Sequence, residues 1–103
     1  MMNLNLNITP QTARKLKKVL DQAQSEESFA QNVIAYQVSE LKRAALNLRL
    51  DLRALEEKYS MPSSLFYKRY RQGKMGDDED YMRWAGLIEM LENNEKRLRG
   101  LEG

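Results

Sequence analysis

The densest group of potential metal ligands in the sequence is an acidic run from Asp77 to Asp80. Carboxylates bind Ca²⁺, but a calcium loop alternates its oxygen ligands along the chain and closes on a glutamate, and this run has neither feature. Aspartate ahead of an apolar periodic segment also marks the start of a helix, where acidic side chains favour the positive end of the helix dipole. We therefore interpret the run as a helix start with Asp77 or Asp78 as the N-cap, and we predict no metal site and no cofactor.

The rest of the composition argues against catalysis. The 103 residues include no cysteine and no histidine, which removes thiolate nucleophiles, imidazole bases and the usual zinc ligands. An enzyme built on a carboxylate or a lysine is the remaining alternative, but the spacing singles out no such site. We predict a non-enzymatic protein with no small-molecule substrate and no membrane segment, working in the reducing cytoplasm.

Aromatic side chains gather beside basic ones in the second half of the chain. The group consists of Tyr67, Tyr70, Tyr81 and Trp84, with Lys68, Arg69 and Arg71 close by. These residue types stack on single-stranded nucleic acid. Their helical spacing is more typical of a core or a protein interface, where Tyr and Trp are frequent anchors. We interpret them as core or interface residues.

One long helix is predicted to organise the chain. Apolar or small residues recur with alternating gaps of four and three, at Ile34, Val38, Leu41, Ala45, Leu48, Leu52, Leu55 and Tyr59. This spacing keeps one stripe of a helix facing a partner. With Leu46 and Leu50 the apolar surface exceeds what one neighbouring helix covers. The pattern predicts a helix over residues 28–59 that binds other chains.

Shorter helices are predicted on both sides. Thr9 followed by Pro10 is a typical N-cap and first helical residue, and the helix that they begin carries a basic face. Pro62 ends the long helix and begins a short one that runs to about residue 72. Gly73 stands where a helix C-terminal glycine is expected. The last helix starts at the acidic run.

Residues 3–8 alternate asparagine with leucine or isoleucine, which is the period of a β-strand. Leu4, Leu6 and Ile8 would share one face. A lone strand leaves its backbone groups unpaired, so we predict that it pairs with the same strand of a second copy about a two-fold axis. A disordered N-terminus is the alternative.

The order of strand, Thr-Pro, basic helix, polar turn and second helix over residues 3–43 resembles the ribbon-helix-helix family of the Arc and MetJ type. The resemblance implies a dimer whose two-stranded ribbon enters the DNA major groove. On this basis Asn3, Asn5 and Asn7 would read base edges, since an asparagine amide can pair with adenine. A nearby basic face would contact the phosphates. The predicted DNA-binding residues are Asn3, Asn5, Asn7, Arg14, Lys15 and Lys18.

Residues 57–86 are similar to small prokaryotic antitoxins. The recognisable positions are Met61, Ser64, Phe66, Gly73, Gly76, Asp77, Asp78, Asp80, Trp84 and Ala85. In type II toxin–antitoxin pairs the antitoxin commonly joins a DNA-binding dimer to a C-terminal segment that covers the toxin. The chain is basic near its start and acidic near its end, which suits two different partners.

Together these observations predict a mainly α fold with one short N-terminal strand, a ribbon-helix-helix-like dimerisation and DNA-binding module over 1–45, and a helical partner-binding extension over 46–103. The expected function is an antitoxin-like transcriptional regulator that binds operator DNA as a homodimer and neutralises a protein partner, which we expect to be a toxin. The predicted dimer interface is Leu4, Leu6, Ile8, Ile34, Val38 and Leu41. The predicted partner-binding residues are Leu52, Leu55, Phe66, Tyr70, Tyr81, Trp84, Leu87 and Leu91.

A helical dimeric scaffold or adaptor without DNA binding is the alternative function. The turn between the first two helices lacks the glycine usual in ribbon-helix-helix proteins. Glu26 and Glu27 also stand where that family places a helix N-terminus against a DNA phosphate, which they would repel.

Overall fold

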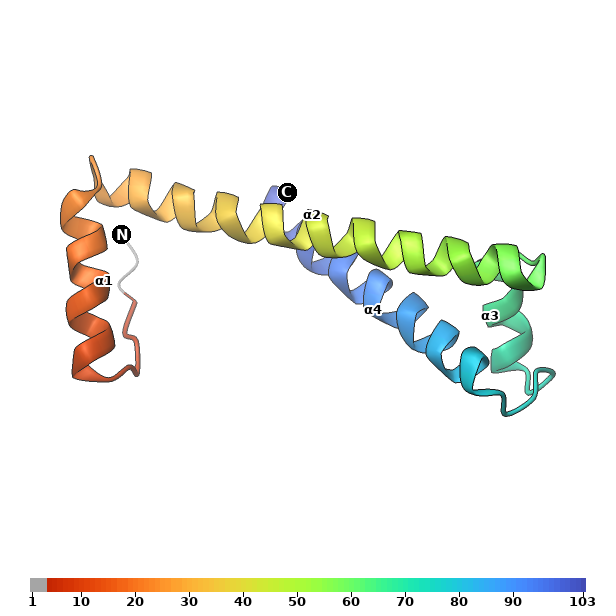
Figure 1. Ribbon diagram of the computed structural model, residues 1–103. Helices are drawn as coiled ribbons and strands as arrows, with labels where there is room; N and C mark the ends of the chain where they lie inside the picture. The colour runs from red at the N-terminus through yellow and green to blue at the C-terminus, as the bar shows by residue number, and fades with distance from the viewer. Residues whose placement is uncertain (1–3) are drawn as a thin grey trace. The chain divides into compact units, whose positions relative to one another are not determined.

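The computed structural model describes residues 4–103 and contains four helices over that range (Figure 1). The helices are α1 (Pro10–Gln22), α2 (Glu26–Tyr59), α3 (Ser63–Arg71) and α4 (Glu79–Glu102). Their positions match the predicted helices to within a few residues. At about 1.5 Å per residue, α2 is about 51 Å long.

The predicted N-terminal strand and ribbon are wrong, because residues 4–103 contain no strand or sheet and the chain from Leu4 to Thr9 is irregular. The apolar side chains of this segment are exposed, from 76% for Leu4 to 40% for Ile8. The physical reason is that a strand's backbone groups need a neighbouring ladder, and the described chain offers none. Alternation of asparagine with leucine therefore did not decide the local structure.

The chain divides into two compact units, Met1–Ala35 and Tyr36–Gly103. This division lies within α2, before the boundary expected after residue 45. In the N-terminal unit both helices begin at hydroxyl N-caps. Thr9 Oγ1 accepts a hydrogen bond from Thr12 N at 3.2 Å, and Ser25 Oγ accepts one from Ser28 N at 3.0 Å. The predicted Thr9–Pro10 helix start is confirmed.

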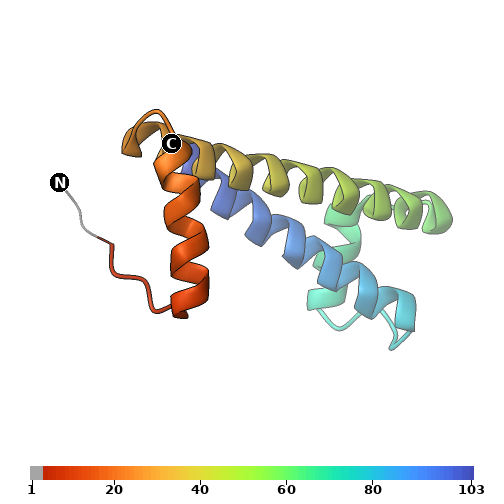
Figure 2. The ribbon, with the colours of Figure 1, turned by 60° about the vertical axis from the view of Figure 1, so that its left-hand side comes forward.

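In the C-terminal unit, α2 and α4 form an antiparallel hairpin. Both views show them closest towards the C-terminus of α4 and spread apart at the other end, where α3 lies between them (Figures 1 and 2). Ion pairs join the two long helices at three levels. They are Lys42–Glu102 at 3.4 Å, Arg49–Glu95 at 3.4 Å and Lys58–Asp80 at 2.6 Å.

Backbone geometry ends α2 and α3. Ser60 adopts a positive φ of 50°, and Met61 N donates to Glu56 O at 3.1 Å, which closes the last turn of α2 before Pro62. Glu56 also accepts a hydrogen bond from Ser63 N through its Oε2 at 2.9 Å, which caps α3. Gly73, with φ 72°, performs the same role after α3, as predicted.

The core of the hairpin is the stripe that the spacing identified in α2. Its buried members are Leu41, Ala45, Leu48, Leu52 and Leu55. They face α4 and α3 of the same chain, so the hairpin itself covers much of the apolar surface that the sequence assigned to other chains.

Candidate protein-binding surfaces

Phe66 and Trp84, two of the predicted partner anchors, stack on each other inside the C-terminal unit. Their ring centroids are 4.0 Å apart, the ring planes differ by 2°, and both residues are 0% exposed. Tyr59 and Tyr81 pack around the stack. Trp84 Nε1 donates a hydrogen bond to Ser63 Oγ at 2.9 Å. Phe66 and Trp84 are therefore buried within the chain and present no surface to a partner.

The other predicted partner-binding residues lie in or around the same core. Leu52 and Leu55 are buried, and the half-buried members are Tyr70, Tyr81, Leu87 and Leu91. Leu52 and Leu91 also line a groove of about 460 Å³ whose walls include Tyr67 and Glu95. Partner binding at these positions stays a prediction. In this fold the half-buried residues of the set are accessible to a partner, whereas the buried ones are covered by the chain itself.

Asp80 connects the start of α4 to the end of α2. Its Oδ2 accepts hydrogen bonds from Lys58 Nζ and Tyr59 Oη, each 2.6 Å long. The bond from Lys58 and then the bond from Tyr59 stabilise the carboxylate and lower the pKa of Asp80 below its usual 3.8. The same hydrogen bonds raise the pKa of Lys58 and of Tyr59. This network stabilises the hairpin and leaves Asp80 charged over the physiological range.

The rest of the acidic run behaves as a helix start. Asp78 is the N-cap of α4, and its Oδ1 accepts a hydrogen bond from Asp80 N at 2.8 Å, which confirms the capping prediction. Within residues 4–103 no group of three or more side chains is arranged to hold a metal ion.

The predicted DNA-binding residues are distributed over the irregular segment and α1. Asn3 lies outside the described residues. Asn5 and Asn7 are exposed in irregular backbone, and the basic Arg14, Lys15 and Lys18 are exposed on α1. Without the ribbon, nothing aligns the asparagines as a reading edge. The basic side chains of α1 are exposed whether or not a ribbon forms, so they can contact phosphates without it.

The predicted dimer residues separate into two environments. Leu4, Leu6, Ile8 and Ile34 belong to the N-terminal unit and are exposed. Val38 is half-buried, and Leu41, only 5% exposed, belongs to the hairpin core. A dimer through these positions stays a prediction.

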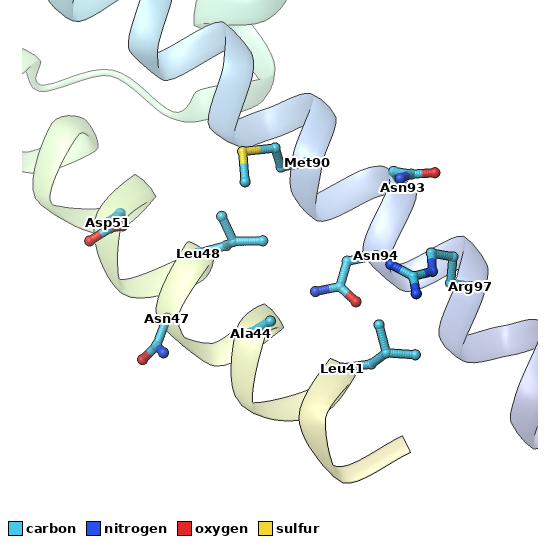
Figure 3. Close-up of a pocket in the computed structure, with 9 residues that line it drawn as sticks. All are labelled: Leu41, Ala44, Asn47, Leu48, Asp51, Met90, Asn93, Asn94 and Arg97. Atoms are coloured by element: carbon cyan, nitrogen blue, oxygen red, sulfur yellow. The ribbon is translucent and has the colours of Figure 1, made fainter. Parts of the chain in front are cut away.

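A second groove lies between α2 and α4 (Figure 3). It has a volume of about 410 Å³ and is lined by Leu41, Ala44, Asn47, Leu48, Asp51, Met90, Asn93, Asn94 and Arg97. Asn94 projects from α4 towards α2 beside Leu41 and Leu48 (Figure 3). It is 8% exposed, and its Oδ1 has no hydrogen-bond partner within residues 4–103.

Sequence reasoning missed Asn94, although a signal was present. Leu87, Leu91, Asn94 and Leu98 follow the same alternating spacing of four and three as the stripe in α2, so Asn94 is a polar residue at an apolar position. A single asparagine at such a position is known to fix the register and number of packed helices. Its significance depends on the unpaired oxygen, which only the structure reveals.

No helix within residues 4–103 is both long enough and apolar enough to cross a membrane. Comparisons with protein-family models, curated proteins and solved structures give no match for this chain.

Proposed function

We propose that this chain is a non-enzymatic, protein-binding regulator of the antitoxin kind whose N-terminal unit obtains its core from another polypeptide. The observation that carries the proposal is the exposure of residues 4–35, none of which is buried. The large apolar side chains exposed there are Leu4, Leu6, Ile8, Val19, Val33 and Ile34. Two short helical segments without a core are marginal by themselves, so the stable form of this unit includes a partner.

The C-terminal unit acts as a preformed hairpin in this proposal. Asp77, Glu79 and Glu92 are exposed and take no part in the ion pairs between α2 and α4. These acidic side chains favour a partner with a basic surface, because complementary charge speeds association. The proposed partners are a toxin-like effector and a second copy of the chain, and the proposed location is the cytoplasm, in keeping with a sequence that has no cysteine.

The test is co-expression with the products of the two genes that flank its own. We expect one of these gene products to co-purify with the wild-type chain. Expressed alone, that product should inhibit growth, and co-expression of the wild-type chain should relieve the inhibition. Val33→Asp, which places a charge on a side chain that is 53% exposed, should abolish both effects. Gln31→Asp introduces the same charge at an exposed polar position of the same helix and should preserve them. Failure of both gene products to bind, or equal behaviour of the two variants, would contradict the proposal.

Operator binding by α1 is a second candidate, favoured by the exposure of Arg14, Lys15 and Lys18. We propose that these side chains contact phosphates. Binding to the promoter of its own gene should then weaken steeply with salt, and Lys15→Gln should reduce the slope of log K against log salt by about 0.9. Lys96→Gln, on α4, is the matched control and should leave the slope unchanged. If promoter and unrelated DNA bind equally weakly, the scaffold function without DNA binding replaces this candidate.

A further inference from the structure

The α2–α4 hairpin contains two separate groups of buried apolar side chains. One is the core cluster at the α3 end of the hairpin, which consists of Leu52, Leu55, Phe66, Trp84 and Ala85. The other lies along α2 towards the C-terminus of α4 and consists of Leu41, Ala45 and Leu48. No member of this second group belongs to the core cluster. The two ends of the hairpin are therefore held by different contacts.

Residues 94–102 of α4 cover the second group, and this cover is weak. On the face of α4 that carries Asn94, Leu98 is half-buried and Leu101 is 41% exposed. The ion pairs between the helices at this end are Arg49–Glu95 and Lys42–Glu102, each 3.4 Å long, and all four side chains are at least 40% exposed. Exposed ion pairs contribute little to stability. The groove of about 410 Å³ beside Asn94 also leaves the packing of the two helices incomplete.

Asn94 adds a cost to the closed arrangement of the two helices. It projects towards α2 between Leu41 and Leu48 (Figure 3), it is 8% exposed, and its Oδ1 is buried without a hydrogen-bond partner within residues 4–103. The packing of α2 against α4 therefore closes this oxygen off from any donor outside the chain. A buried acceptor without a donor loses the hydrogen bond that it makes to water in the open form. Separation of the helices restores that bond, so Asn94 favours opening.

We propose that residues 94–102 form a displaceable strap, which covers Leu41, Ala45 and Leu48 in the closed form and detaches from α2 while the core cluster around Trp84 stays folded. A helical segment as short as this is marginal in water without packing, so the strap unwinds when it detaches. The open form uncovers the part of the α2 stripe that the sequence pattern assigned to other chains. The strap therefore controls access to that surface, and this device depends neither on the proposed effector nor on a dimer.

The test is hydrogen exchange of individual backbone amides in the full chain, followed by NMR and corrected for intrinsic exchange rates. The amides of residues 97–99 lie in the strap, and those of residues 84–91 lie in the part of α4 that packs on the core cluster. We expect the strap amides to exchange at least about a hundredfold faster than the slowest amides of residues 84–91. The reason is that the latter exchange only when the core cluster also unfolds.

Two substitutions separate the two openings. Ser63→Ala removes the acceptor of the Trp84 Nε1 hydrogen bond, so it should speed exchange of the slowest amides of residues 84–91 about tenfold and leave residues 97–99 unchanged. Asn94→Leu removes the unpaired oxygen and should slow exchange of residues 97–99 about tenfold. Asn93→Leu makes the same replacement at the exposed neighbouring position and is the matched control, with exchange of residues 97–99 within about twofold of the wild type.

Three results would overturn the inference. They are strap amides as slow as the slowest amides of residues 84–91, a Ser63→Ala variant that speeds both sets equally, and an Asn94→Leu variant that behaves like Asn93→Leu. If Ser63→Ala does not fold, Asp80→Asn takes its place with the same expected pattern, because Asp80 accepts the hydrogen bonds that join α4 to the end of α2. A strap that does not open leaves the proposed function intact, and a chain without an effector leaves the strap intact.

Discussion

The hydrogen bond between Trp84 and Ser63 offers a sharp test of the hairpin core. Trp84 is 0% exposed, and its Nε1 donates to Ser63 Oγ at 2.9 Å. Replacement of Ser63 by alanine removes the acceptor and leaves a buried N–H unpaired. Such a group costs about 1–3 kcal/mol of folding stability. The hydrogen bond to Glu56 Oε2 is donated by the backbone N–H of Ser63, so the substitution does not remove it.

The matched control is Ser64→Ala. Ser64 follows Ser63 in the first turn of α3 but is exposed, so both substitutions gain similar helix propensity and differ in the lost acceptor. Trp84 is the single tryptophan of the chain, and its fluorescence follows unfolding of the hairpin in urea. With a slope of about 1 kcal/mol per molar urea, Ser63→Ala should lower the midpoint relative to Ser64→Ala by about 1 M or more. Equal midpoints for the two variants would refute the proposed role of this hydrogen bond.

Three further predictions concern the ends of the helices. Ser60→Gly should raise the free energy of unfolding by about 1 kcal/mol in the same urea assay, since an L-residue with positive φ is strained; no gain would show that Ser60 is held there without strain. Gly73→Ala should lower that free energy by about 1 kcal/mol, because an L-residue at this positive φ is strained. Nothing lies near the added Cβ, so the strain comes from the backbone alone. An unchanged urea midpoint would contradict this prediction. Asp80→Asn should reduce stability at neutral pH, since Lys58 and Tyr59 lower the pKa of the carboxyl group from 3.8. A group with a lowered pKa contributes its stabilisation above the unfolded value and loses it as the pH falls through the folded value, so melting curves of wild type and variant should converge under acidic conditions. A constant difference down to the lowest pH would contradict this linkage.

Local chemistry determined the helices of this protein. Thr9 and Asp78 are caps whose side chains complete hydrogen bonds with backbone groups a few residues away, and Pro62 and Gly73 act through their own backbone preferences. These interactions involve only neighbours in the chain, so they can be predicted from sequence. The apolar stripe of α2 was identified for the same reason, because its spacing follows from helical geometry.

Tertiary structure decided what covers that stripe. The same spacing serves any helix that packs against it, and the predicted partner-binding residues included Leu52, Phe66 and Trp84. In the folded chain α2, α3 and α4 bury these side chains among themselves. Residues 4–9 also depended on the tertiary structure. An alternating pattern forms a strand only where a second strand supplies hydrogen bonds, and the described chain contains none. Asn94 became informative only when packing removed its amide from water without supplying a donor, because the free energy of a polar side chain depends on what surrounds it in three dimensions.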